Sequence, residues 1–177
     1  MIPPRAKQPR VCNPGQAAIP LVVDLLCRGN LVRLRVTGRS MLPWLENGAV
    51  VTLRKVPAEA VEPGNIVLFH TAEGRPLLHR VISSRRDTDG AIQFLVKGDA
   101  RALPDGFLPG SSIVGKVVTV TRKTSHGTCR AVSLESPFRG AVHRALALLS
   151  HRSPRLFCAL STRLVPPWRR VRTCFSR

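Results

Sequence analysis

The sequence predicts a mainly β protein: an antiparallel core arranged as a sandwich or partly open barrel, a short N-terminal helix and a basic, helical C-terminal tail. Three observations lead to this fold class. Short apolar segments recur between residues 31 and 122, each bounded by Gly, Pro or Asp. The 177 residues are 44% hydrophobic, which excludes general disorder. Beyond residue 122 the apolar period becomes that of a helix.

The chain is expected to divide into three parts. Residues 1–16 are rich in proline and have no apolar period, which predicts a flexible arm. Residues 17–122 are expected to form one folded domain. Its first element is a short helix over residues 17–28, because Gly29-Asn30 is a typical C-terminal stop. Residues 123–177 are expected to form a basic, partly helical extension.

The strands of the folded domain follow from apolar periodicity and turn residues. Leu31–Val36 alternates apolar and basic residues, which is typical of a strand with one buried face. The other expected strands span residues 49–53, 66–69, 77–83, 92–96 and 112–121. The expected turns between them include residues 62–65, 73–76, 87–90 and 104–110.

In the extension, Ser136-Pro137 provides an N-cap and a favourable first helical residue. Apolar residues then follow at helical spacing, namely Phe138, Val142, Ala145, Leu146 and Leu149. A second, shorter helix is expected over residues 156–164.

Charge is concentrated in the extension. The chain carries a net charge of +18, of which residues 122–177 supply +11, from 12 Lys or Arg and one acid. Such a segment attracts nucleic acid or anionic lipid. Alternatively, its basic residues have no binding partner. Aromatic residues are 5% with no Tyr, which argues against a nucleic-acid partner that needs base stacking. The extension could instead contact an anionic membrane surface through Phe138, Leu146, Phe157 and Trp168, or form a helix that covers the β core or an open sheet edge.

The expected location is cytoplasmic or peripheral to a membrane. The N-terminus does not have the pattern of a signal peptide, and no apolar run reaches about 20 residues. The five cysteines are widely spaced with no CxxC pair, which predicts reduced thiols rather than a disulfide framework or a zinc site.

Three segments supply candidate catalytic residues. Ser40 lies in Thr37–Pro43 directly after the first strand, and His79 lies within a strand. Asp99 and Asp105 follow the strand that ends near Val96. A serine hydroxyl needs a base such as imidazole, and the base needs a carboxylate to orient it. Each residue also has a structural interpretation: Ser40 and the aspartates as turn residues, His79 as a packed core residue.

The motifs around these residues resemble the type I signal peptidase family. They are Gly-Arg-Ser-Met-Leu-Pro at 38–43, His-Arg-Val at 79–81 and Lys-Gly-Asp at 97–99, with Pro-Gly-Asn-Ile-Val at 63–67. The pattern is closest to the ER, archaeal and SipW-like branch, in which histidine replaces the lysine base. The resemblance spans residues 31–121 and implies that the folded domain is a signal-peptidase-like catalytic domain.

The resemblance implies a serine endopeptidase that cuts after small residues in a precursor or leader peptide, without metal or organic cofactor. Ser40 would be the nucleophile and His79 the general base. Asp105 would orient His79, with Asp99 as the alternative. Met41 would wall the substrate groove, and the Ser40 N–H would stabilise the oxyanion.

Two departures from the family pattern favour a peptidase dedicated to one small precursor. Leu42-Pro43-Trp44 replaces the acidic residue that commonly follows Ser-Met, and Ala100-Arg101 replaces the usual Asn after Gly-Asp. The alternatives are a non-catalytic scaffold and a nucleic-acid-binding relative of the self-cleaving repressor peptidases. Those repressors use a lysine base and cut an Ala-Gly or Cys-Gly bond, and neither dipeptide occurs here.

Overall fold

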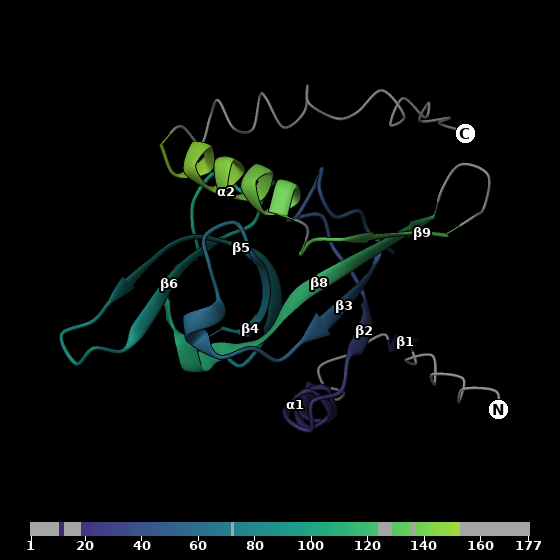
Figure 1. Cartoon of the computed structure of the whole chain (residues 1–177), viewed down its shortest axis with the longest axis horizontal. Helices are drawn as coiled ribbons and strands as arrows, with labels where there is room; N and C mark the ends of the chain where they lie inside the picture. Colours follow the sequence, from purple (N-terminus) through teal and green to yellow (C-terminus); the bar gives the residue numbers. More distant parts are fainter. Residues whose placement is uncertain (1–10, 13–18, 72, 124–128, 136, 153–177) are drawn as a thin grey trace.

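The computed structural model describes residues 11–12, 19–71, 73–123, 129–135 and 137–152 (Figure 1). Its helices are α1 (Ile19–Cys27) and α2 (Pro137–Arg152), with short 3-10 turns at Ala58–Ala60 and Gly110–Ser112. Its strands are β1 (Val11–Cys12), β2 (Val32–Arg35), β3 (Val50–Arg54), β4 (Ile66–His70), β5 (Pro76–Arg86), β6 (Ile92–Lys97), β7 (Gly106–Pro109), β8 (Ile113–Lys123) and β9 (Cys129–Ser133).

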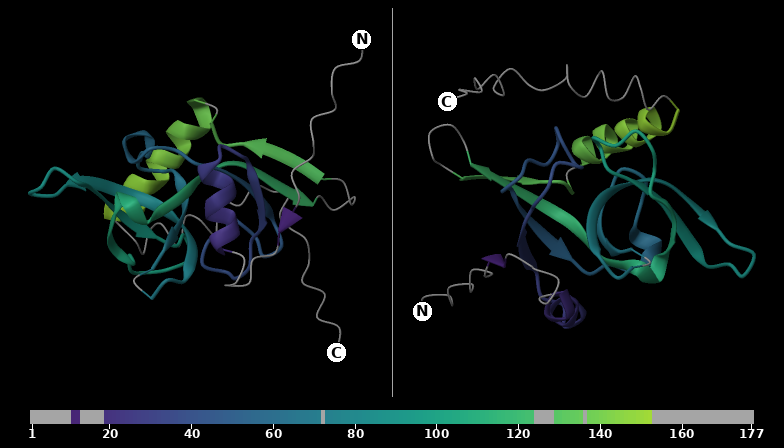
Figure 2. Two further views of the ribbon diagram at one scale, coloured as in Figure 1. Left: turned by 90° about the horizontal axis from the view of Figure 1, so that it is seen from below. Right: turned by 180° about the vertical axis from the view of Figure 1, so that it is seen from behind.

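The strands form one open, mainly antiparallel sheet. They follow the order β1-β2-β3-β8-β4-β5-β6-β7, and β9 pairs with β8 outside this path. Among the described strands, only β1 and β2 pair in parallel. The sheet is strongly curved where β4, β5 and β8 meet (Figure 2). Helix α1 contacts the sheet at β2 and β8, and helix α2 contacts it at β5. The predicted fold class is confirmed.

The predicted apolar periods correspond to the strands that build the core. In β2, Val32 and Leu34 are buried while Arg35 is exposed, as the alternation requires. All four apolar residues of β4 are buried, because this strand lies between β5 and β8. One core cluster joins α1 to β2, β3 and β8, and a second joins β4, β5 and β6.

Helix α1 ends at the predicted stop. The N–H groups of Gly29 and Asn30 donate to the carbonyl oxygens of Leu26 and Leu25, each at 3.0 Å. Gly29 has a φ of 78°, a left-handed conformation that glycine adopts without strain.

Three strands were not predicted from the sequence. β7 lies within residues 104–110, where Pro and Gly indicated only a turn, and it pairs with β6 alone, as suits a proline-containing edge strand. Most of β9 is exposed, so it has no apolar alternation. β1 places Val11 and Cys12 of the expected flexible arm beside β2, while the rest of the arm lies outside the described residues.

Helix α2 covers part of the sheet. Its Leu146 and Ala147 are buried, so Leu146 packs against protein rather than facing a membrane. Ser136, the side chain of Phe138 and the second predicted helix, with Phe157 and Trp168, lie outside the part of the chain that is described. Over the described residues, no helix combines the length and apolarity needed to cross a bilayer.

Candidate active site

Ser40 lies in the loop that connects β2 to β3. The two ends of this loop are held together by hydrogen bonds from Val36 N–H to Ala49 O (2.7 Å) and from Gly48 N–H to Val36 O (2.8 Å). Gly38 enters the loop with a φ of 96°, which a residue with a side chain rarely adopts. Ser40 itself is half-buried.

The next residue, Met41, anchors the Ser40 loop from inside. It is 3% exposed and belongs to the core cluster that also holds Leu45. The N–H of Leu45 donates to Met41 O at 2.8 Å, which closes a helical turn directly after Ser40. The structure therefore places Met41 beneath the loop, and its contact with substrate stays a prediction.

His79 contacts Ser40 and Asp105 through its two ring nitrogens. It is fully buried on β5, its Nε2 lies 3.0 Å from Ser40 Oγ, and its Nδ1 lies 2.5 Å from Asp105 Oδ2. An ionised carboxylate only accepts hydrogen bonds, so Nδ1 carries the proton and donates to Asp105. The lone pair of Nε2 then faces the serine hydroxyl, which donates to it. This is the arrangement that a serine nucleophile requires.

Asp105 is fixed by the backbone on either side of it. Its N–H donates to Val96 O at 2.9 Å, and it is followed by Gly106, with a φ of 104°, at the start of β7. Its side chain is 18% exposed. Asp105 follows His79 by 26 positions in the sequence, and the unpredicted strand β7 explains why its carboxylate faces the His79 ring.

Burial lowers the pKa of His79 below its ordinary value of 6.5. The charge and hydrogen bond of Asp105 act in the opposite direction, and the nearby guanidinium of Arg101 lowers the pKa further. The imidazole is consequently neutral at neutral pH, which is the form that accepts a proton.

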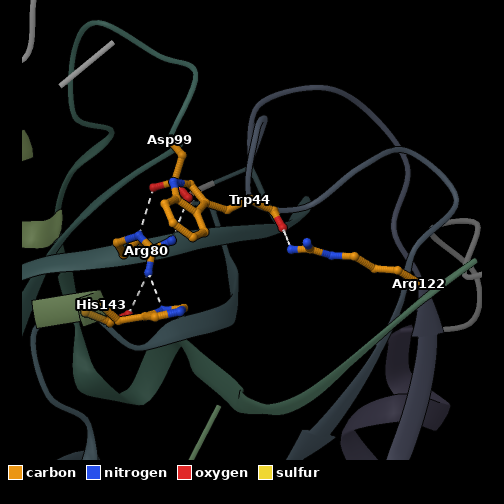
Figure 3. Close-up of polar contacts among 6 residues, drawn as sticks. Trp44, Arg80, Asp99, Arg122 and His143 are labelled. Atoms are coloured by element: carbon orange, nitrogen blue, oxygen red, sulfur yellow. Dashed lines mark hydrogen bonds and ion pairs between the residues drawn. The ribbon is translucent and has the colours of Figure 1, made fainter. Parts of the chain in front are cut away.

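Asp99, the alternative carboxylate, contacts Arg80 instead of His79. Its Oδ1 and Oδ2 accept hydrogen bonds from Arg80 Nε (2.8 Å) and Nη2 (2.7 Å), a bidentate pair in which both side chains are buried (Figure 3). Arg80 Nη1 also donates to Gly64 O at 2.9 Å and to His143 Nδ1 at 2.7 Å. Of the two aspartates that the sequence left open, the structure thus brings Asp105 to the imidazole.

Comparison with known proteins adds a partial similarity. Over 72 residues the chain is 36% identical to the signal peptidase complex catalytic subunit SEC11C of Homo sapiens, Mus musculus and Canis lupus familiaris. No family model matches the chain.

This chain is similar in part to a signal peptidase catalytic subunit.

The match covers 40% of the chain and 37% of each relative, so the chain spans little more than a third of the length of these curated relatives.

The turn that follows β6 holds the Ser40 loop in place. The N–H of Ala100 donates to Ser40 O at 2.8 Å. A Cβ on Gly98 would lie 2.8 Å from Ser40 O and 3.0 Å from His79 Nε2. Glycine is therefore required here because the backbone of the turn packs directly against both catalytic candidates.

If Ser40 and His79 act as a hydrolytic pair, Gly98→Ala is expected to reduce hydrolysis by about 100-fold, because the added methyl group must displace the Ser40 carbonyl or the His79 ring. The measurement is kcat on a cleaved peptide at a temperature where the variant is folded. Gly140→Ala, which places its Cβ in open space on α2, is the matched control. Equal kcat for Gly98→Ala and wild type would show that the turn does not position the site.

The motifs that identify Ser40 and His79 indicate no role for Arg80 or Trp44. Arg80 follows His79 on a strand, so its side chain points to the opposite face of the sheet, where α2 covers it. A signal was present, since a basic residue inside the apolar segment 77–82 needs an acidic partner if it is buried. The structure also places His143, on α2, against Arg80.

Proposed function

We propose that the chain is a serine endopeptidase of the signal peptidase type, which hydrolyses a peptide bond after a small residue in a precursor or leader peptide. The observation that carries this proposal is the continuous hydrogen-bonded series from Ser40 through His79 to Asp105. The similarity to signal peptidase catalytic subunits supports the same chemistry.

In the first half of the reaction, Ser40 Oγ attacks the scissile carbonyl carbon while His79 Nε2 accepts the hydroxyl proton. Asp105 stabilises the imidazolium through Nδ1. His79 then donates the proton to the leaving amine, the peptide C–N bond breaks, and the substrate remains as an ester on Ser40. In the second half, His79 activates a water that hydrolyses this ester, which restores Ser40 and releases the carboxylic acid.

The backbone N–H of Ser40 is available to stabilise the oxyanion that forms on the carbonyl oxygen. Among the residues that the structure describes, this N–H donates to no acceptor. A preorganised donor of this kind acts only when negative charge develops, so it lowers the energy of the transition state more than that of the bound substrate.

The rate should depend on the protonation state of His79. Only the neutral imidazole accepts the serine proton, so kcat/KM is expected to rise with pH, with a midpoint under 6.5. Arg101→Gln removes a positive charge that lowers the His79 pKa, and should move the midpoint to higher pH. A midpoint above 6.5 in the wild type would contradict the proposed environment of His79.

The proposal is tested by incubating the full chain with a peptide library and mapping cleavage sites by mass spectrometry. We expect cuts that follow small residues, produced by the wild type and not by Ser40→Ala. A stable library would contradict the peptidase, as would cleavage that persists in Ser40→Ala. Cuts that depend on Ser40 but follow large residues would contradict the proposed specificity alone.

A further inference from the structure

His143 on helix α2 contacts the back of the candidate active site. Its Nδ1 accepts the hydrogen bond from Arg80 Nη1, and its ring packs against that of Trp44 with centroids 6.0 Å apart (Figure 3). Arg80 lies on β5 and Trp44 lies in the loop that carries Ser40. His143 therefore bridges two segments that are far apart in the sequence.

The residues around His143 lie in the same segments as the catalytic candidates or next to residues that contact them. Arg80 follows His79 on β5, and Trp44 lies four residues after Ser40. Asp99, the buried partner of Arg80, precedes Ala100, whose N–H holds the carbonyl of Ser40. Three segments shape the site: β5, the Ser40 loop and the turn after β6. All three therefore meet at the Arg80 guanidinium and at His143, its acceptor on α2.

Helix α2 lies close against the turn that precedes β4. A Cβ on Gly64 would lie within 2.8 Å of backbone atoms of His143 and Arg144, so only glycine permits this approach. Leu146 and Ala147 are buried one turn further along the helix. At the exposed rim, Arg144 pairs with Glu62 at 3.2 Å. This close packing fixes where the His143 ring lies.

We propose that His143 is a positioning residue, through which docked α2 holds the segments carrying Ser40 and His79 in register. The proposal rests on the proposed function, because it concerns the alignment of that same site. Arg80 is fully buried, so loss of the His143 acceptor leaves one N–H of Nη1 without its partner, while the bonds to Asp99 and Gly64 O remain. The buried charge is then under-satisfied, which favours a shift of the guanidinium. Movement of Arg80 displaces β5 at His79, and movement of Asp99 displaces the turn that holds Ser40.

The test uses two variants that have nearly the same shape. His143→Asn retains an acceptor at the position of Nδ1, whereas His143→Leu does not. The readout is the second-order rate at which a fluorophosphonate probe labels Ser40 in the folded full chain, with folding checked by circular dichroism. Arg144→Ala, which removes only an exposed ion pair, is the control on the same helix.

We expect His143→Leu to label about 10-fold or more slowly than wild type, and His143→Asn and Arg144→Ala to label within a few-fold of it. If His143→Leu does not fold, His143→Ala takes its place, since alanine favours the helix, and added imidazole should restore its labelling rate.

Equal labelling of His143→Leu and wild type would overturn the positioning role and leave the peptidase intact. Equal losses in the Leu and Asn variants, or no recovery of His143→Ala with imidazole, would also overturn it. A wild-type chain that does not label at Ser40 would instead overturn the proposed function, and the positioning role with it.

Discussion

Ser40→Ala is expected to lower the rate of peptide hydrolysis by on the order of 10⁶-fold, the scale of loss when a serine hydrolase loses its nucleophile. The hydroxyl forms the covalent ester, and no other hydroxyl among the described side chains lies within hydrogen-bonding distance of His79. Water activated by His79 could replace it only poorly, because the attacking oxygen would no longer be held in place. The measurement is kcat on the best peptide from the library.

The variant should remain folded. The side chain of Ser40 is half-buried and its hydroxyl contacts His79, while its carbonyl still accepts the hydrogen bond from Ala100. Ser84→Ala, which changes an exposed serine on β5, is the matched control and should retain full activity. Activity of Ser40→Ala that equals that of Ser84→Ala would remove Ser40 from the mechanism.

The second large effect is expected at Asp105. In Asp105→Asn the amide can present an N–H₂ group to the imidazole, which favours the tautomer with its proton on Nε2, where it cannot accept from Ser40. In other Ser-His-Asp enzymes this change lowers kcat by about 10⁴-fold with little change in geometry. We expect a loss of similar size here, with KM nearly unchanged, because substrate binding does not use the carboxylate.

Asp99→Asn provides the contrast, because the two aspartates have different partners. This change breaks a buried ion pair with Arg80, so it should lower the free energy of unfolding by about 3–5 kcal/mol. At a temperature where both variants are folded, Asp105→Asn should be the slower enzyme. The opposite order, with Asp99→Asn the less active and Asp105→Asn the less stable, would contradict the assignment of the orienting carboxylate.

The elements that could be predicted from the sequence are those whose burial is encoded locally. Val32 and Leu34 alternate with basic residues, and Ile66–Phe69 is apolar throughout, so β2 and β4 were evident. β7 and β9 were not, since an edge strand bounded by Gly and Pro, and a strand that is largely exposed, lack that pattern. Their pairing depends on neighbours that are distant in the sequence.

The same distinction holds for the site. The motifs around Ser40 and His79 identified both residues, but both aspartates lie in turns, and their side chains are directed by contacts with distant strands. Asp105 faces His79 because its N–H pairs with Val96, and Asp99 faces away because Arg80 is buried on the other face of the sheet. The contribution of α2 depends on a close approach to Gly64, which no local pattern reveals.

The central claim is that the buried imidazole of His79 activates Ser40. The most direct measurement is the reaction of the full chain with a fluorophosphonate probe, followed by peptide mapping of the modified residue. We expect a single adduct on Ser40 in the wild type, whose formation slows as the pH falls below 6.5, and no adduct in folded His79→Gln. An adduct that forms on Ser40 equally fast without the imidazole, or only on another serine, would contradict the account.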